Sequence, residues 1–186
     1  EQACAMSAGG YAKYKNGLSA VMVTSGCGST NTITGLLDAW QDNTPVIFIS
    51  GQIKRKETSR NSKTNLRQFG VQEADIISIV EPITKYAVMV NEPEKILYHL
   101  EKAVHLALSG RPGPVWIDIP LDVQGFSPDE KDLIHFIPEE KSINGICGMD
   151  KFFEMYQQAK RPIILAGNGV RLSGAVEDLR EFSKRN

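Results

Sequence analysis

The chain has 186 residues, of which 21 are Lys or Arg and 22 are Asp or Glu, so its formal net charge is -1. Such a balance gives no strong attraction for a polyelectrolyte and argues against nucleic acid as the main ligand. With 41% hydrophobic and 23% charged residues, the composition is typical of a globular protein with a buried core. Its apolar runs, such as residues 46–49, are far shorter than the roughly 20 apolar residues that cross a bilayer, which excludes a membrane span.

The cysteines indicate the redox environment of the protein, and the first residues indicate whether the chain is a fragment. Cys4, Cys27 and Cys147 stand far apart with no metal-ligand spacing, so we expect neither a disulfide framework nor a zinc site. A reducing, cytoplasmic setting fits best. The chain opens at Glu1 without an initiator Met or a signal-like segment, and it reads there like the interior of a domain. We therefore expect it to be a fragment.

The first third of the chain alternates helix and strand. Helical spacing of apolar residues predicts a helix over 2–15, which Asn16-Gly17 ends. An apolar strand over 18–24 runs into a glycine turn, and Ile33 to Trp40 then mark the apolar face of a helix. The continuous apolar run at 45–51 is typical of a strand covered on both faces in a parallel sheet.

The middle of the chain repeats this order after a basic surface loop at 51–68. Further elements are predicted at 72–80 (helix, stopped by Pro82), 86–90 (strand), from Pro93 to Gly110 (helix) and 114–120 (strand). Strands alternating with helices predict an α/β fold with a doubly wound parallel sheet.

A polar, proline-bearing stretch at 125–149 is predicted to be an interdomain linker. It separates a first domain, 1–124, from a second, 150–186, which we interpret as only the start of another α/β domain. Its expected elements are a helix at 150–159, a strand at 162–166, a turn at 167–169 and a helix from Ser173.

The turn at 24–31 is the best-placed candidate for a site, because ligands of open α/β sheets bind where strands end and helices begin. It lacks the third glycine of the dinucleotide-binding pattern and the Gly-Lys-Ser/Thr of a P-loop, so a purely structural turn remains an equal interpretation. The basic residues at 54–67 either attract an anionic substrate or are solvated surface. His99, His105 and His135 show no partner pattern and indicate surface or core roles.

Several motifs resemble, in order, those of the pyrimidine-binding domain of thiamine diphosphate enzymes of the acetolactate synthase group. They are Glu1-Gln2-Ala3-x-x-Met6-x-Ala8-x-Gly10-Tyr11-Ala12, Val23-Thr24-Ser25-Gly26-x-Gly28-x-Thr30-Asn31, Ser50-Gly51-Gln52, Gln72-Glu73, Thr84-Lys85 and Gly110-Arg111-Pro112-Gly113-Pro114-Val115-x-Ile117-Asp118-Ile119-Pro120. The resemblance covers 1–124, without the domain's first strand and helix. From Arg161 on, the chain looks like the start of the same family's central domain.

The resemblance implies roles for five residues. In that family a glutamate in the position of Glu1 hydrogen-bonds N1′ of the cofactor's aminopyrimidine; in an apolar pocket it shares a proton there and favours the tautomer that removes the thiazolium C2 proton. Gly26, Gly28 and Asn31 would shape the turn beside the pyrimidine and substrate pocket, and Gln72 would line the substrate channel.

The resemblance also implies a whole-enzyme activity. It points to a homodimeric or homotetrameric thiamine diphosphate- and Mg²⁺-dependent decarboxylase or carboligase (a lyase or transferase) acting on a 2-oxo acid such as pyruvate, as in branched-chain amino acid biosynthesis. The family's Gly-Asp-Gly metal motif does not occur here, so the Mg²⁺ ligands would lie outside this chain and the fragment alone is expected to be inactive. Whether FAD binds is left open.

Two departures and two alternatives qualify this interpretation. Val71 and Leu121 stand where acetolactate synthases typically carry an aromatic residue and a cation, which leaves another 2-oxo acid decarboxylase or carboligase open. The alternatives are a dinucleotide-binding module built on the turn at 24–31, and a non-catalytic dimerisation or regulatory domain that retains the fold.

Overall fold

The computed structural model describes residues 1–139 and 148–185. These divide into two compact units, Glu1–Pro138 and Glu139–Asn186, each of which is described by itself. Residues 140–147 of the expected linker lie outside the described residues.

A four-stranded, entirely parallel sheet is the centre of the first unit, with the strand order β1-β2-β4-β3. Its strands are β1 (Ser19–Val23), β2 (Val46–Gln52), β3 (Ala87–Met89) and β4 (Val115–Pro120). Parallel neighbours cannot be joined by a tight hairpin, so a longer crossover connection leads from each strand to the next. The predicted α/β fold is confirmed.

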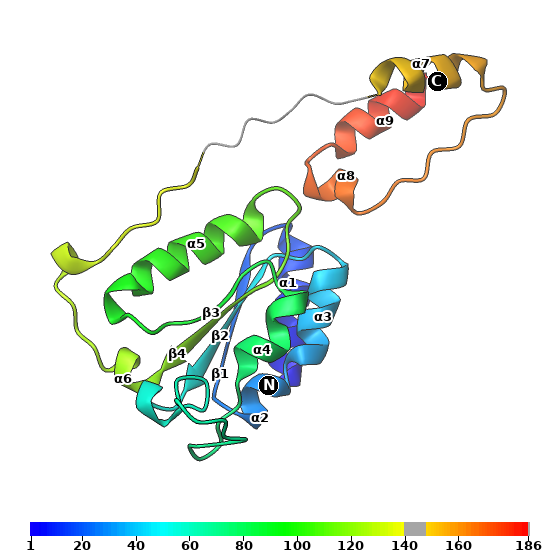
Figure 1. Cartoon of the computed structure of the whole chain (residues 1–186). Coiled ribbons are helices and arrows are strands. Elements are labelled where there is room, and N and C mark those ends of the chain that lie inside the picture. Colours follow the sequence, from blue (N-terminus) through cyan, green and yellow to red (C-terminus); the bar gives the residue numbers. More distant parts are fainter. Residues whose placement is uncertain (140–147, 186) are drawn as a thin grey trace. The chain divides into compact units, whose positions relative to one another are not determined.

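Helices cover both faces of this sheet (Figure 1). On one face lie α1 (Gln2–Lys15), α3 (Ile33–Gln41) and α4 (Ile76–Val80), and on the other lies α5 (Ile96–Leu108). Successive strand residues point to opposite faces, so a fully apolar strand supplies both layers. Phe48 and Trp116, paired in register, stack at a centroid distance of 5.2 Å towards α1 and α3, whereas Val115 packs towards α5.

Small residues let α1 approach its neighbours closely. Its buried stripe includes Ala5, Ala8 and Ala12, and a Cβ added to Gly35 of α3 would lie 2.6 Å from the Cβ of Ala5. The helix ends where the sequence predicted, because Asn16 adopts a left-handed conformation (φ 53°) and donates its N–H to the Ala12 carbonyl.

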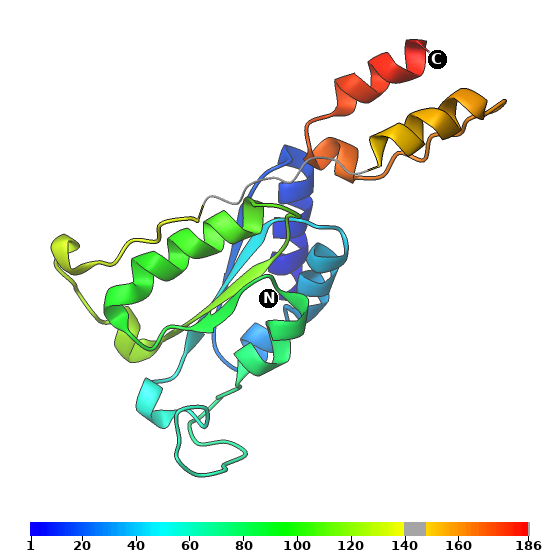
Figure 2. The same ribbon diagram turned by 45° about the horizontal axis from the view of Figure 1, so that its top comes forward.

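The remaining helical elements are short in the first unit. They are α2 (Cys27–Thr30), α6 (Leu121–Gln124) and the 3₁₀ turns Arg55–Glu57, Glu81–Ile83, Pro93–Lys95 and Glu130–Asp132. The second unit holds α7 (Met149–Gln158), α8 (Gly169–Leu172) and α9 (Val176–Arg185). Residues 53–75 project as a loop beyond the carboxyl ends of the strands (Figure 2).

Two element predictions need correction. The helix expected over 72–80 begins only at Ile76, because Gln72 has a positive φ of 58° and cannot be helical. The strand expected at 162–166 does not form: Ile163 is 93% exposed and Leu165 97% exposed. A strand needs a neighbour for its backbone hydrogen bonds, and the described residues of the second unit contain no other strand.

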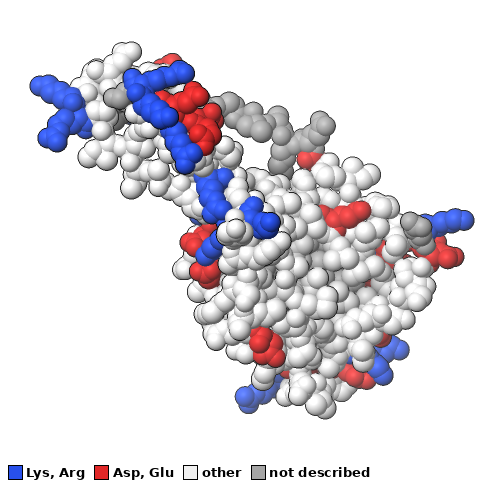
Figure 3. All heavy atoms as spheres, turned by 180° about the vertical axis from the view of Figure 1, so that it is seen from behind, with Lys and Arg blue, Asp and Glu red and all other residues white. Residues whose placement is uncertain are grey.

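None of the described helices is long and apolar enough to cross a membrane. On the face seen in Figure 3, the charged side chains of the first unit are scattered among a largely uncharged surface.

Candidate active site

The amino end of α1 meets the glycine turn that follows β1. Glu1 directly precedes α1, and Asn31 donates a hydrogen bond from Nδ2 to Oε2 of Glu1 at 3.0 Å. Glu1, Cys27, Gly28, Thr30 and Asn31 line a cavity of about 370 Å³. The structure therefore brings together three of the five residues that the resemblance singled out, although they are up to 30 positions apart in the sequence.

Gly28 keeps this cavity open. A Cβ added there would lie 2.5 Å from Cγ2 of Thr24 and 3.6 Å from Oε1 of Glu1, so a side chain would clash with Thr24 and fill the space beside the carboxylate. Among the described residues, Oε1 of Glu1 accepts no hydrogen bond. The site thus offers a carboxylate with one anchored oxygen and one available oxygen.

Glu1 is exposed, which differs from the apolar pocket that the resemblance implied. The described residues enclose it only on the side of the glycine turn. The residues present fit a planar, nitrogen-bearing group placed against Oε1, but they do not by themselves remove that group from water.

The other two residues, Gly26 and Gln72, meet through their backbones. Gly26 has φ 62° and ψ -124°, a conformation essentially restricted to glycine. A Cβ there would lie 2.3 Å from the carbonyl oxygen of Gln72, so a close backbone approach is built into the turn. The Gln72 side chain is exposed and does not line the cavity at Glu1.

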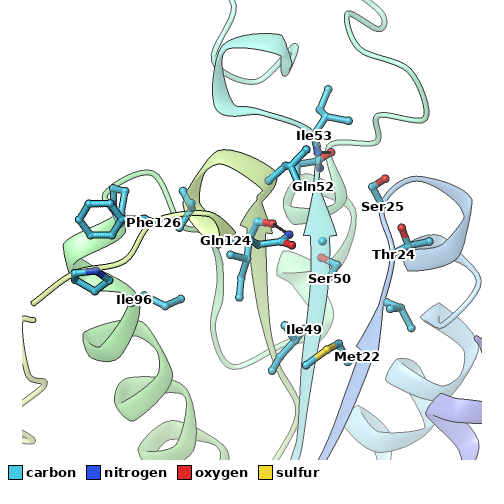
Figure 4. Close-up of a pocket in the computed structure, with 17 residues that line it drawn as sticks. Met22, Thr24, Ser25, Ile49, Ser50, Gln52, Ile53, Ile96, Gln124 and Phe126 are labelled. Atoms are coloured by element: carbon cyan, nitrogen blue, oxygen red, sulfur yellow. Dashed lines mark hydrogen bonds between the residues drawn. The ribbon is translucent and has the colours of Figure 1, made fainter. Parts of the chain in front are cut away.

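A second cavity, of about 750 Å³, opens at the carboxyl ends of β1, β2 and β4 (Figure 4). Its polar groups come from Thr24, Ser25, Ser50, Gln52 and Gln124, and its apolar wall includes Met22, Ile49, Ile96, Leu121 and Phe126. No motif in the sequence pointed to this cavity as such. The signal that could have found it is the rule that ligands of parallel sheets bind at the carboxyl ends of strands.

Behind this cavity lies a buried acid. Ser50 donates to Oδ1 of Asp118 at 2.5 Å and Gln52 donates to Oδ2 at 3.0 Å, while the Trp116 indole N–H donates to Ser50 at 2.9 Å. Burial raises the pKa of Asp118 to about 6, against the opposing effect of the two hydrogen bonds from Ser50 and Gln52. The motifs of the resemblance include Ser50, Gln52 and Asp118, but the contact between these side chains follows only from the pairing of Ser50 with Asp118 across β2 and β4.

Two of the basic residues at 54–67 form ion pairs, which favours a structural role for them. Arg55 forms an ion pair with Asp122 at 2.8 Å, and Arg60 forms one with Asp75 at 2.8 Å. These contacts tie the loop to α6 and to the start of α4.

The histidines have partners that the sequence did not indicate. His99 Nδ1 lies 2.6 Å from the Tyr86 hydroxyl, where burial raises the pKa of Tyr86 to about 12 and lowers that of His99. His135 lies 2.9 Å from Glu101. Both pairs lie on the α5 side of the sheet, away from Glu1.

Comparison with known proteins identifies the family of the chain. Residues 1–79 match the family described as "Thiamine pyrophosphate enzyme, N-terminal TPP binding domain". The chain belongs to the thiamine pyrophosphate enzymes. Thiamine pyrophosphate is the cofactor called thiamine diphosphate above, and the matched residues contain Glu1, Gly26, Gly28, Asn31 and Gln72.

Curated relatives place this member of the thiamine pyrophosphate enzyme family in the acetolactate synthase group. It is 34% identical over 190 residues to the acetolactate synthase large subunit of Lactococcus lactis, covering 100% of this chain and 31% of that protein. It is 35% identical to the probable acetolactate synthase large subunit of Methanocaldococcus jannaschii, covering 99% of this chain and 31% of that protein. It is also 35% identical to the acetolactate synthase isozyme 2 large subunit of Escherichia coli, covering 98% of this chain and 32% of that protein. The chain thus spans about a third of the length of these relatives.

Proposed function

We propose that this chain supplies the aminopyrimidine-binding face of a thiamine diphosphate-dependent active site within a longer enzyme. That enzyme acts as a decarboxylase or carboligase on a 2-oxo acid such as pyruvate. The observation that carries the proposal is the arrangement of Glu1, Gly28 and Asn31 around one cavity, inside the segment that matches the cofactor-binding domain.

The chemistry of these residues suits the role. Thiamine diphosphate, when bound, supplies the electron sink for the bond that is broken. Glu1 would hold the pyrimidine nitrogen N1′ through Oε1 and share a proton with it. Asn31 keeps the carboxylate oriented by binding Oε2, and Gly28 leaves room for a flat ring beside Oε1.

The exposed position of Glu1 fits the homo-oligomer, a dimer or a tetramer, that the resemblance implies. A carboxylate that shares a proton with the cofactor works best away from water, and another domain or subunit must supply that enclosure. The described residues hold no group of three or more His, Cys, Asp or Glu that could bind a metal. We therefore propose that Mg²⁺ is bound by residues outside this chain. The proposal does not require FAD. We also propose a cytoplasmic location, for which the support is the spacing of the three cysteines.

The substrate is proposed from the relatives' names and from two side chains. Acetolactate synthase activity, with a role in branched-chain amino acid biosynthesis, is the first candidate. Val71 is 83% exposed, and Leu121 is 55% exposed and lines the 750 Å³ cavity. Both are aliphatic where the resemblance led us to expect an aromatic ring and a cation, so the assay should include branched and aromatic 2-oxo acids beside pyruvate.

The test is Glu1→Gln in the enzyme that contains this chain. We expect exchange of the cofactor's C2 proton, followed by NMR, to slow by about 100-fold or more, because the glutamine cannot share a proton with N1′. Glu81→Gln, at an exposed glutamate outside the cavity, is the matched control and should leave the exchange rate unchanged. Equal exchange rates in Glu1→Gln and the unmodified enzyme would refute the proposal.

The 186-residue chain alone should be inactive. With thiamine diphosphate and Mg²⁺ added, decarboxylation of pyruvate at an enzymatic rate would show that no further chain is needed.

A further inference from the structure

One carboxylate outside the Glu1 cavity gathers an unusual number of hydrogen bonds. Glu73 accepts from the Ser59 amide and, at 2.5 Å, from the Ser59 hydroxyl through Oε1. Its Oε2 accepts from the amides of Phe69 at 2.8 Å and Gly70 at 3.3 Å. A single side chain therefore joins the two ends of the loop formed by residues 59–70.

The charge on Glu73 strengthens these contacts. Burial acts to raise its pKa, but the hydrogen bonds from Ser59, Phe69 and Gly70 outweigh burial and lower it. The ionised carboxylate accepts charge-assisted hydrogen bonds, which are about twice as strong as neutral ones.

The residue before Glu73 is the one expected to line the substrate channel. Gln72 has a positive φ of 58°, and its carbonyl oxygen occupies the space that a Cβ on Gly26 would need. Such a backbone conformation persists only where its surroundings hold it.

The residues that follow Glu73 are also anchored. Gln52 donates to the Ala74 carbonyl at 2.9 Å, and Arg60 pairs with Asp75 at 2.8 Å. These contacts fix the segment to β2 and to the loop, but among the described residues only Glu73 binds both ends of the loop at once.

We propose that Glu73 is a positioning residue that closes residues 59–70 into a loop and thereby holds Gln72 against Gly26. Gln72 and the exposed Val71 then lie at the turn that carries Gly28 and Asn31, where they control the approach of the 2-oxo acid. This role rests on the proposed function, whereas the closure of the loop can be tested without it.

Hydrogen exchange on the 186-residue chain tests the closure. Glu73→Gln keeps the size of the side chain but turns an NH₂ group towards one set of donors, so the amides of Ser59, Phe69 and Gly70 should exchange about tenfold faster. Amides of β2 and β4 should keep their protection. Glu57→Gln is a control at an exposed carboxylate two residues before the loop, whose side chain makes no hydrogen bond among the described residues, and it should change nothing.

Ser59→Ala provides a milder second variant, because it removes one donor and leaves the carboxylate in place. It should accelerate exchange at Phe69 and Gly70 less than Glu73→Gln does. Unchanged loop exchange in both variants would overturn the proposal, as would an equal loss of protection throughout the sheet in both.

Kinetics of the enzyme that contains this chain test the positioning role. Glu73→Gln should raise KM for pyruvate by about tenfold and leave exchange of the cofactor's C2 proton unchanged. A faster-exchanging loop with an unchanged KM would overturn the role. If Glu1→Gln fails to slow C2 exchange, the proposed function fails, but the exchange data on the loop still stand.

Discussion

Asp118 is a carboxylic acid inside a parallel sheet, and its environment gives the protein a pH-dependent stability. Its pKa rises from 3.8 to about 6 on folding, chiefly through burial. The folded state therefore binds this proton more tightly than the unfolded state does. The stability that Asp118 contributes is fully present below pH 3.8 and is lost as the pH rises through about 6.

We expect this effect to appear in Asp118→Asn. Relative to the variant, the free energy of unfolding of the unmodified chain should fall by about 2 kcal/mol between pH 4 and pH 7. Urea unfolding of both proteins across that range measures the difference, in which the titration of distant groups cancels.

Asp122 is the matched control with the opposite sign. Burial acts to raise its pKa, but its contacts with Arg55 outweigh burial and lower it, so its contribution is present at neutral pH and is lost on acidification. The free energy of unfolding of Asp122→Asn should therefore approach that of the unmodified chain as the pH falls. A pH-independent difference for Asp118→Asn would mean that the buried acid is not perturbed in the folded state.

At the scale of elements, the glycine turn after β1 depends on a conformation that other residues avoid. Gly26→Ala would place a Cβ 2.3 Å from the Gln72 carbonyl oxygen at a φ of 62°. We expect the free energy of unfolding to fall by at least about 2 kcal/mol and amides at 69–75 to exchange faster.

Gly110→Ala is the control at a glycine of positive φ with open space beside it. Gly110 has nearly the same φ, 59°, but a Cβ there would meet nothing within 4 Å. It should cost only about 1 kcal/mol, the ordinary penalty of a left-handed alanine. Equal losses for the two variants, measured by urea unfolding, would show that the contact with Gln72 is unimportant.

Sequence patterns predicted the types of most elements in the first unit. The two predictions that were wrong, one in each unit, have physical causes. Periodicity predicted the helix at 2–15 and the strands that became β1, β2, β3 and β4. It placed the start of α4 too early, because apolar spacing cannot register a left-handed residue at Gln72. It also assigned a strand to 162–166 from composition alone, whereas a strand forms only beside a partner.

At the scale of the whole molecule, the apolar cores lie entirely within one unit. Both buried clusters consist of residues between Ala5 and Val123, which belong to Glu1–Pro138. A chain cut after Pro138 should therefore unfold cooperatively, because it keeps all of this burial. Circular dichroism during urea unfolding checks this, and a truncated chain without a cooperative transition would show that the rest of the sequence is required.

The sequence by itself determined the α/β class, most elements of the first unit and the resemblance to a cofactor-binding domain, because periodicity and short motifs are local properties. It also singled out Glu1, Gly28 and Asn31. Only the tertiary structure decided that these three meet in one cavity, that Glu1 is exposed, and that Gln72 touches Gly26 rather than Glu1. The Asp118 network and the Glu73 loop closure likewise depend on residues that are distant in sequence and come together only through strand pairing and loop folding.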